Sequence, residues 1–333
     1  GTGGSQNRGR SVAISADGNT VIVGSCTNNI YNNPPFGAII YTRNGSVWSQ
    51  QGNFLVGTGM VIGTAISQSV AVSISADGNT AIIGGSGDYY YQGAAWIFTR
   101  SGTTWSQQGN KLVGSGSIGT TIFQSQSVSI SADGNTAMIG SSWDNNYQGA
   151  VWVFTRSAGI WSQQGSKLTG SGATGSPYFG TSLCLAADGN TAIVGGPNAY
   201  SNHGAAWIFT RSGVAWNQQG NSLLGTGYTG AARQGTSVSL SADGNIALLG
   251  GINDNAGLGA AWVFTRSGTT WSQQGNKLVG TGSVGSSVYQ GYAVSLSADG
   301  NTALIGGRND NSNQGAAWLF TKSGTVWSQQ GNK

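Results

Sequence analysis

The sequence predicts an all-β chain that forms a six-bladed β-propeller, with four antiparallel strands per blade and about 55 residues per blade. Three observations lead to this prediction. Glycine supplies 58 of the 333 residues and glutamate is absent, which disfavours helices. Three short motifs recur along the whole chain. Between them, short apolar runs alternate with turn signals, as expected for many short strands.

The motifs set the length of the repeat. Ala-Asp-Gly-Asn occurs six times, and its Asp residues are 60, 56, 55, 55 and 56 positions apart. Trp-Ser-Gln-Gln-Gly first occurs at Trp48, and Gly-Ala-Ala-Trp-Ile-Phe-Thr-Arg occurs at 93–100 and 204–211. We therefore expect one propeller domain over residues 1–333. Its expected blades are about 1–56, 57–113, 114–169, 170–224, 225–279 and 280–333.

Each unit reads as four strands, and the second unit serves as the example. Its strands are expected at 69–75, 80–84, 94–99 and 104–108. The second of these is a continuous apolar run, which is typical of a strand buried on both faces. Asp77-Gly78 is expected to join the first two strands as a two-residue turn with positive φ at both positions. The hairpin Asp residues are thus structural, and the repeated tryptophans are expected to pack between blades.

Composition excludes several partners. The net charge of +4 comes from 14 Lys and Arg that are spread along the chain, whereas proteins that bind nucleic acid usually show a basic stripe. We therefore expect no nucleic-acid partner. No apolar run approaches the ~18 residues of a membrane helix, so no membrane insertion is expected. The sequence leaves the oligomeric state open.

Candidate binding residues lie in the loops between the second and third strands and in the links between blades. These segments meet on one face and carry most of the variation, and ligand-binding residues favour variable loops on a rigid scaffold. Four Asp residues fall eleven positions after the hairpin Asp, and aromatic residues stand beside them. The candidates are Asn28, Tyr31, Asp88, Tyr90, Trp143, Asp144, Tyr147, Asp254, Tyr289 and Asp310.

Carboxylates and amides suit sugar hydroxyls, and aromatic faces cover the apolar patches of a sugar ring. The chain is therefore interpreted as a multivalent carbohydrate-binding module, a lectin or adhesin, with glycans or cell-surface proteins as partners. Two readings compete with this one. Asp and Asn also form turns by bonding their own backbone, and the link aromatics would also serve to pack blades. The alternative function is a structural or protein–protein interaction scaffold of a cell surface or extracellular filament.

Catalysis is not expected. His203 is the sole histidine, so a Ser–His–Asp arrangement cannot recur with the repeat. A glycosidase needs two positioned carboxyls, and the loops offer one Asp per blade. We therefore predict no catalytic residues and no cofactor. The Asp and Asn oxygens of the loops leave calcium open, with no metal ligands assigned.

The string GTSVSLSADGN, followed by GAAWVFTRSG and WSQQ between residues 235 and 274, resembles the FG-GAP repeat. The resemblance is to the bacterial-type variant, related to the integrin α-subunit propeller, and it extends over all six units. It implies a β-propeller that is secreted or at a cell surface. Integrin-type repeats carry a calcium loop with several carboxylates, whereas the corresponding hairpin here has Asp77 alone.

Overall fold

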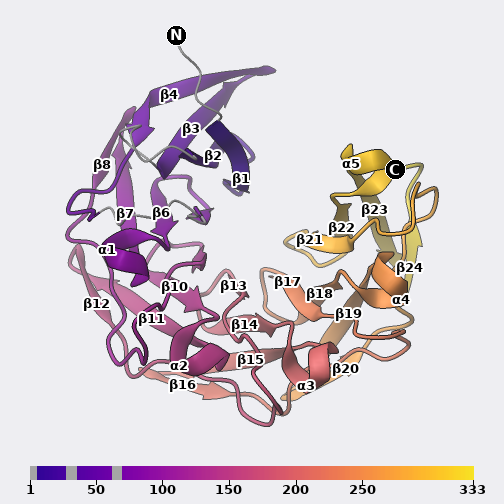
Figure 1. Ribbon diagram of the computed structural model, residues 1–333. Coiled ribbons are helices and arrows are strands. Elements are labelled where there is room, and N and C mark those ends of the chain that lie inside the picture. The colour runs from indigo at the N-terminus through magenta and orange to yellow at the C-terminus, as the bar shows by residue number, and fades with distance from the viewer. Residues whose placement is uncertain (1–5, 28–35, 62–69) are drawn as a thin grey trace. The chain divides into compact units, whose positions relative to one another are not determined.

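The computed structural model describes residues 6–27, 36–61 and 70–333, and these form six four-stranded antiparallel sheets (Figure 1). Each sheet holds four strands in chain order. The fold is a six-bladed β-propeller with four strands per blade, as the sequence predicted. The chain divides into two compact units of three blades, residues 1–146 with 150–168 and residues 147–149 with 169–333.

The first unit contains blades 1 to 3. Blade 1 is β1 (Gln6–Ile14), β2 (Thr20–Thr27), β3 (Phe36–Asn44) and β4 (Val47–Leu55). Blade 2 is β5 (Val72–Ile74), β6 (Thr80–Gly85), β7 (Ala94–Ser101) and β8 (Thr104–Gln107). Blade 3 is β9 (Ser127–Ile130), β10 (Thr136–Ser141), β11 (Ala150–Ser157) and β12 (Ile160–Gln163). One-turn elements α1 (Asp88–Tyr91) and α2 (Asp144–Tyr147) follow β6 and β10.

The second unit contains blades 4 to 6. Blade 4 is β13 (Ser182–Leu185), β14 (Thr191–Gly196), β15 (Ala205–Ser212) and β16 (Ala215–Gln218). Blade 5 is β17 (Gln234–Leu240), β18 (Ile246–Gly251), β19 (Ala260–Ser267) and β20 (Thr270–Gln273). Blade 6 is β21 (Gln290–Leu296), β22 (Thr302–Gly307), β23 (Ala316–Ser323) and β24 (Val326–Gln329). The one-turn elements here are α3 (Ala199–Asn202), α4 (Asp254–Gly257) and α5 (Asp310–Asn313).

The second strand of a blade is buried on both faces, as its apolar run predicted. Every residue of β6, β10 and β14 is buried. In blade 2 this strand pairs with β7 in an unbroken antiparallel register that sets Ile83 opposite Trp96. The apolar side chains therefore point alternately toward the two neighbouring blades, and the core lies between sheets.

The hairpin between the first two strands differs from the predicted two-residue turn. Only Gly78 has a positive φ, of 67°. Its N–H donates to the Ser75 carbonyl at 3.0 Å, and the Ser75 N–H donates to the Thr80 carbonyl at 2.8 Å, so a four-residue loop closes the hairpin. Asp77 accepts hydrogen bonds from the Ser75 hydroxyl at 2.5 Å and the Asn79 N–H at 2.9 Å. The carboxylate thus organises the longer loop, which confirms its structural role.

The tryptophans of the third strands are fully buried, as expected. Trp152 donates its indole N–H to the Ser115 carbonyl at 2.7 Å. Its ring lies directly against Gly114, where an added Cβ would come within 2.2 Å of it. Only glycine permits this approach, which explains why the sequence repeat begins with a glycine. The equivalent buried tryptophans are Trp96, Trp207, Trp262 and Trp318.

The tryptophans of the fourth strands join neighbouring blades within a unit. The Trp105 indole N–H donates to the side-chain oxygen of Gln51 in blade 1 at 3.0 Å. Arg100 lies over the Trp105 ring at 5.5 Å and also donates to Gln51, at 3.2 Å. Blade 3 repeats this arrangement on Gln108, and blades 5 and 6 repeat the tryptophan bond on Gln219 and Gln274. Within each unit, a blade is therefore held to the next by a polar clamp as well as by apolar packing.

Candidate functional site

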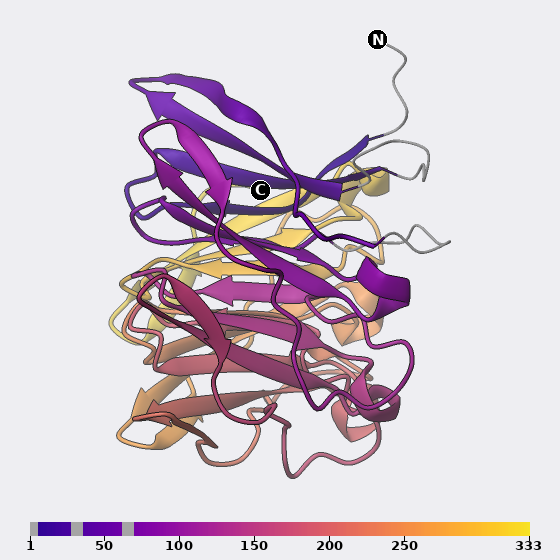
Figure 2. The same cartoon turned by 90° about the vertical axis from the view of Figure 1, so that its left-hand side faces the viewer.

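The candidate site lies at the end of the blades where α1 to α5 are found, called here the turn end. Figure 2 shows α1 and α2 on the same end of their blades. These one-turn elements are left-handed, because their middle residues have positive φ, such as 50° at Asn145 and 53° at Asn146. A left-handed turn costs an L-residue about 1–2 kcal/mol, and such strain gathers at functional positions.

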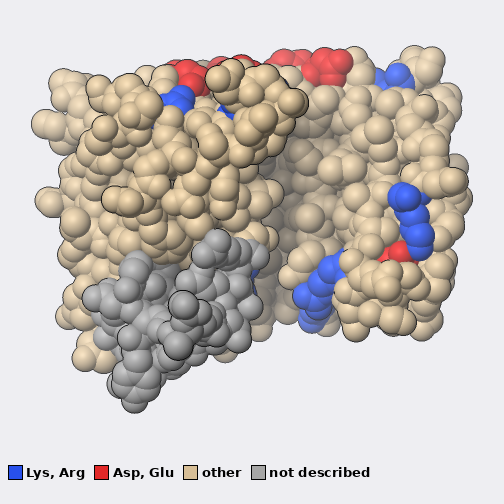
Figure 3. All heavy atoms as spheres, turned by 90° about the horizontal axis from the view of Figure 1, so that it is seen from above, with Lys and Arg blue, Asp and Glu red and all other residues tan. Residues whose placement is uncertain are grey.

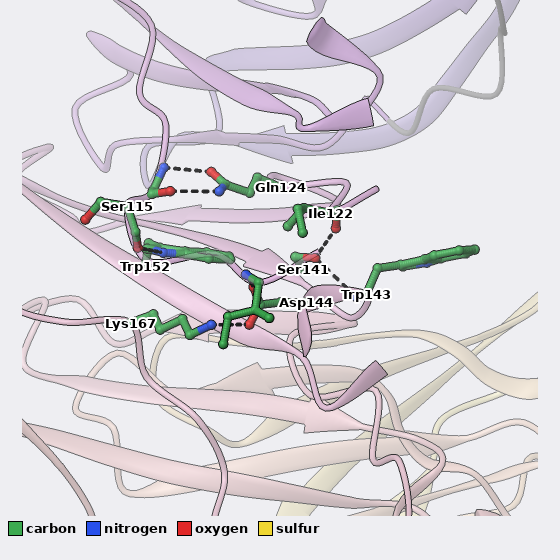
Figure 4. A network of polar contacts seen from close by, with 10 residues as sticks. Ser115, Ile122, Gln124, Ser141, Trp143, Asp144, Trp152 and Lys167 are labelled. Carbon is green, nitrogen blue, oxygen red and sulfur yellow. Dashed lines mark hydrogen bonds and ion pairs between the residues drawn. The ribbon is translucent and has the colours of Figure 1, made fainter. Parts of the chain in front are cut away.

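An ion pair beneath the turn holds it in place. Asp144 is fully buried, and its Oδ2 binds the Lys167 Nζ while its Oδ1 accepts the Ile118 N–H at 2.7 Å. Figure 4 shows Asp144 and Lys167 pointing toward each other inside blade 3. The ion pair recurs as Asp88–Lys111, Asp254–Lys277 and Asp310–Lys333. Hydrogen bonds from Lys333 and from the backbone N–H of Val284 outweigh burial and lower the pKa of Asp310.

Blade 4 replaces both members of this ion pair. Ala199 stands at the Asp position and Ser222 at the Lys position. The Tyr200 hydroxyl instead shares a hydrogen bond with the Ser222 hydroxyl at 2.7 Å and donates to the Gly172 carbonyl at 2.9 Å. A cavity of about 390 Å³ lies beside these groups. Asp and Lys are therefore both absent from blade 4, which indicates that the two residues act as a pair.

The four loop Asp residues were predicted to contact a ligand, and the structure places them inside the blades. Both carboxylate oxygens of each one are engaged by a lysine and by a backbone N–H. This burial assigns Asp88, Asp144, Asp254 and Asp310 to the support of the turns. The candidates Asn28 and Tyr31 lie outside the described residues.

The aromatic candidates lie at the surface of the turn end. In the first unit, Tyr89 and Tyr90 are exposed and meet edge to face, with ring centroids 6.0 Å apart. Phe123, from the following link, contacts Tyr91 at 5.0 Å and the exposed Trp143 at 4.8 Å. Figure 4 shows the Trp143 ring pointing away from the buried polar network. These side chains form two aromatic groups, Tyr89 with Tyr90 and Phe123 with Tyr91 and Trp143.

In the second unit the aromatic residues pair in the same way. Tyr147 stacks on Tyr178 with centroids 4.9 Å apart and an interplanar angle of 15°. His203 lies against Tyr228 at 4.9 Å. Tyr289, another predicted site residue, lies under Arg308, whose guanidinium carbon is 5.6 Å from the ring centroid. Each pair joins a turn residue or its neighbour to a residue of the next link.

The left-handed conformation of four residues in the links between blades was not predicted from the sequence. Phe123, Tyr178, Arg233 and Tyr289 all have φ between 56° and 58°. The Tyr178 N–H donates to the carbonyl of Tyr147 at 3.0 Å, and the other three donate to the matching turn in the same way. The left-handed backbone of the link thus fixes the Tyr91–Phe123 and Tyr147–Tyr178 pairs. Non-glycine residues in this conformation carry no simple sequence signal, which is why they were not predicted.

The chain as a whole carries little charge. In the view of Figure 3, uncharged residues form most of the visible surface, in keeping with the 7% of charged residues in the chain. Within residues 6–27, 36–61 and 70–333, no group of three His, Cys, Asp or Glu side chains could hold a metal ion. Across the same ranges, no helix has the length and hydropathy needed to cross a bilayer. The site therefore offers aromatic faces and neutral polar groups.

Comparison with known proteins identifies the fold alone. No family model and no curated protein matches the chain. Its structure is similar to hydrazine synthase from Kuenenia stuttgartiensis, with a TM-score of 0.55 and 10% identity over 93% of this chain and 76% of that chain. It also matches TolB from Acinetobacter baumannii, with a TM-score of 0.44 and 14% identity over 80% of this chain. The chain spans about half, 55%, of that TolB. A putative TolB from Agrobacterium tumefaciens matches with a TM-score of 0.45 and 12% identity, over 78% of this chain and 79% of that one.

Proposed function

We propose that this chain is a non-enzymatic binding module that recognises carbohydrate through the aromatic residues of its turn end. The observation that carries the proposal is the exposure of Tyr89, Tyr90 and Trp143 at the left-handed turns, where Tyr89 and Tyr90 themselves have positive φ. Large aromatic rings are costly to leave in water unless a ligand covers them. Rings held in advance lose little conformational entropy when a ligand binds.

The repeat supplies several such surfaces on one molecule. The clusters at Phe123 and Tyr178 differ in residue type but share one backbone geometry, and His203 with Tyr228 forms a third aromatic pair. Weak sites gain avidity when they are repeated at fixed distances, so a multivalent lectin or adhesin fits this plan. The low charge favours a neutral, hydroxyl-rich ligand over a strongly ionic one. The resemblance to the FG-GAP repeat supports a secreted or cell-surface location.

A glycan array followed by calorimetric titration tests the proposal. We expect saturable binding with more than one sugar per chain, and we expect Trp143→Ala and Tyr90→Ala each to lower the number of sites or the affinity. Val214→Ala is the matched control, because Val214 is exposed but lies in the tight turn between β15 and β16. Binding is expected to persist in a chelator, since no metal is part of the proposal. Absence of binding to every glycan on a broad array would overturn the proposal.

The second candidate is a protein-interaction scaffold. Tyrosine and tryptophan are enriched in protein interfaces as well as in sugar sites. The Tyr89–Tyr90 pair, whose rings are exposed and meet edge to face, favours this reading. Two results together would select the scaffold. The protein would capture cell-surface proteins and lose this ability in Tyr90→Ala, and it would bind no glycan on the array.

A further inference from the structure

The cavity of about 390 Å³ in blade 4 is built by that blade alone. Its walls are residues 171–172 of the preceding link, Tyr200 of α3 and residues of the segment 218–224. All of them belong to the second compact unit. Small-molecule sites in proteins have volumes of about 300–1,000 Å³. The cavity is therefore large enough for a small ligand.

The cavity lies where blade 4 departs from the repeat. In blade 2, Lys111 reaches the buried Asp88, and the next residue, Tyr89, is 56% exposed. In blade 4 the Asp and Lys positions hold Ala199 and Ser222, so the ion pair is absent. Serine is much shorter than lysine, and it carries no charge. The space beside the turn is therefore open to another group.

Tyr200 occupies part of that space. It has the same turn position as Tyr89, yet it is half-buried. Its hydroxyl shares a hydrogen bond with the Ser222 hydroxyl at 2.7 Å and donates to the Gly172 carbonyl at 2.9 Å. These two bonds hold the ring as a wall of the cavity. A ring that is fixed in advance loses little conformational entropy when a ligand binds.

The cavity also offers polar groups that can bind a ligand. The side-chain amide of Asn221 lies on its wall and has no hydrogen-bond partner among residues 6–27, 36–61 and 70–333. The Ser222 oxygen has two lone pairs, so it can accept a further hydrogen bond beside the one it shares with Tyr200. Leu224 adds apolar area. None of the described residues that line the cavity is charged.

We propose that this cavity binds one ring of a neutral sugar. The Tyr200 ring suits the apolar face of a sugar, and Asn221 and Ser222 suit its hydroxyls. The uncharged walls disfavour an ionic ligand, because a charge that leaves water without a partner is penalised. The site goes beyond the proposed function, since it is a cavity within one blade and uses none of the exposed aromatic residues named there.

NMR titration of isotope-labelled protein tests the proposal. Glucose, galactose, mannose and N-acetylglucosamine are added one at a time. We expect at least one of them to shift the amide signals of Gly172 and Asn221 saturably. The equivalent residues of blade 2 are Gly59 and Asn110, and their signals are expected to stay in place because Lys111 is present there. If none of the four sugars shifts Gly172 or Asn221, the proposal is overturned.

A matched pair of single variants tests the polar contact. Asn221→Ala removes one hydrogen-bonding group, so we expect the affinity for the sugar to fall about tenfold. Asn110→Ala changes the same residue at the same repeat position, in a blade that keeps its lysine. It is expected to bind the sugar as the wild type does. Equal losses in the two variants would contradict a site in blade 4.

The double variant Ala199→Asp/Ser222→Lys tests the cavity itself. It rebuilds the ion pair of blade 2, where Asp88, Tyr89 and Lys111 occur together. Tyr200 would lose its bond to the Ser222 hydroxyl and turn to solvent as Tyr89 does, so the wall would be lost. We expect cooperative unfolding in urea, which shows that the variant is folded, and no saturable shift at Gly172. A folded double variant that binds as the wild type does would refute the proposal.

The cavity site and the proposed function fail separately. Glycan-array binding that is lost in Trp143→Ala, with no shift at Gly172 for any of the four sugars, would overturn the cavity site and leave the proposed function standing. Saturable shifts at Gly172, together with array binding that neither Trp143→Ala nor Tyr90→Ala reduces, would establish the cavity and overturn the role proposed for the exposed aromatic residues.

Discussion

The buried ion pair beneath α2 gives the sharpest test of the structural reading. Asp144→Ala removes the partner of Lys167 and the acceptor of the Ile118 N–H in one step. Lys167 is only 16% exposed, so its charge would remain largely buried and unpaired. Removal of one member of a buried ion pair costs about 3–5 kcal/mol of the free energy of unfolding. We expect Asp144→Ala to fall in that range.

Blade 4 supplies the compensating change. Its Ala199 and Ser222 stand at the positions of Asp144 and Lys167. The double variant Asp144→Ala/Lys167→Ser leaves no unpaired charge, so we expect it to be about 1–3 kcal/mol more stable than Asp144→Ala alone. Asn146→Ala is the matched control, because Ala256 adopts the same left-handed conformation in α4. It is expected to change stability by less than about 0.5 kcal/mol.

Urea unfolding followed by tryptophan fluorescence measures these three variants and the single substitution Lys167→Ser, which completes the double-mutant cycle. The reasoning would be refuted if Asp144→Ala lost less than about 1 kcal/mol, or if the double variant lost as much as the two single substitutions added together. In the first case the ion pair would not support the turn. In the second, the two residues would act independently, and their joint absence from blade 4 would need another explanation.

Three further predictions concern packing, the polar clamp and pH. Gly114→Ala should lower the free energy of unfolding by about 1–3 kcal/mol, because the new Cβ would meet the Trp152 ring; thermal unfolding measures this. Gln108→Ala should lower the free energy of unfolding by about 1–3 kcal/mol, since it leaves two donors of blade 3 without their acceptor. Bonds from a serine hydroxyl and an asparagine lower the pKa of Asp299 from 3.8 to about 2. Its stabilising contribution should therefore be complete above pH 3.8 and lost as pH falls toward 2, and an NMR titration that returned an ordinary pKa would contradict this.

The strands were predictable because their signals are local. Alternation in the first strand, the apolar run at 80–84 and the repeat of Trp96 each specify a strand without reference to the rest of the chain. The hairpin at Asp77 was predicted in the right place but with the wrong turn. The rule for two-residue turns ignores the Ser75 hydroxyl, which bonds the carboxylate and lengthens the loop.

The loop positions of the four Asp residues were predictable from the repeat, but the role of their carboxylates was not. Asp144 and Lys167 are 23 residues apart, so no local pattern joins them. The joint replacement by Ala199 and Ser222 in blade 4 is the signal that could have revealed the ion pair. The left-handed turns could not be inferred, because Tyr, Asn, Ser and Ala occupy positions where glycine is the usual indicator of positive φ.

In the left-handed turns, the backbone keeps the same conformation whichever side chains its middle residues carry. The middle pairs Tyr89-Tyr90, Asn145-Asn146 and Asn255-Ala256 share one backbone path although their chemistry differs. That path is set by groups outside the pair, such as the Gly93 N–H on the Asp88 carbonyl at 2.9 Å. Mutation or selection can therefore exchange these side chains one blade at a time without refolding the blade. The molecule thus presents the middle residues of its turns as separately variable positions on a backbone of constant conformation.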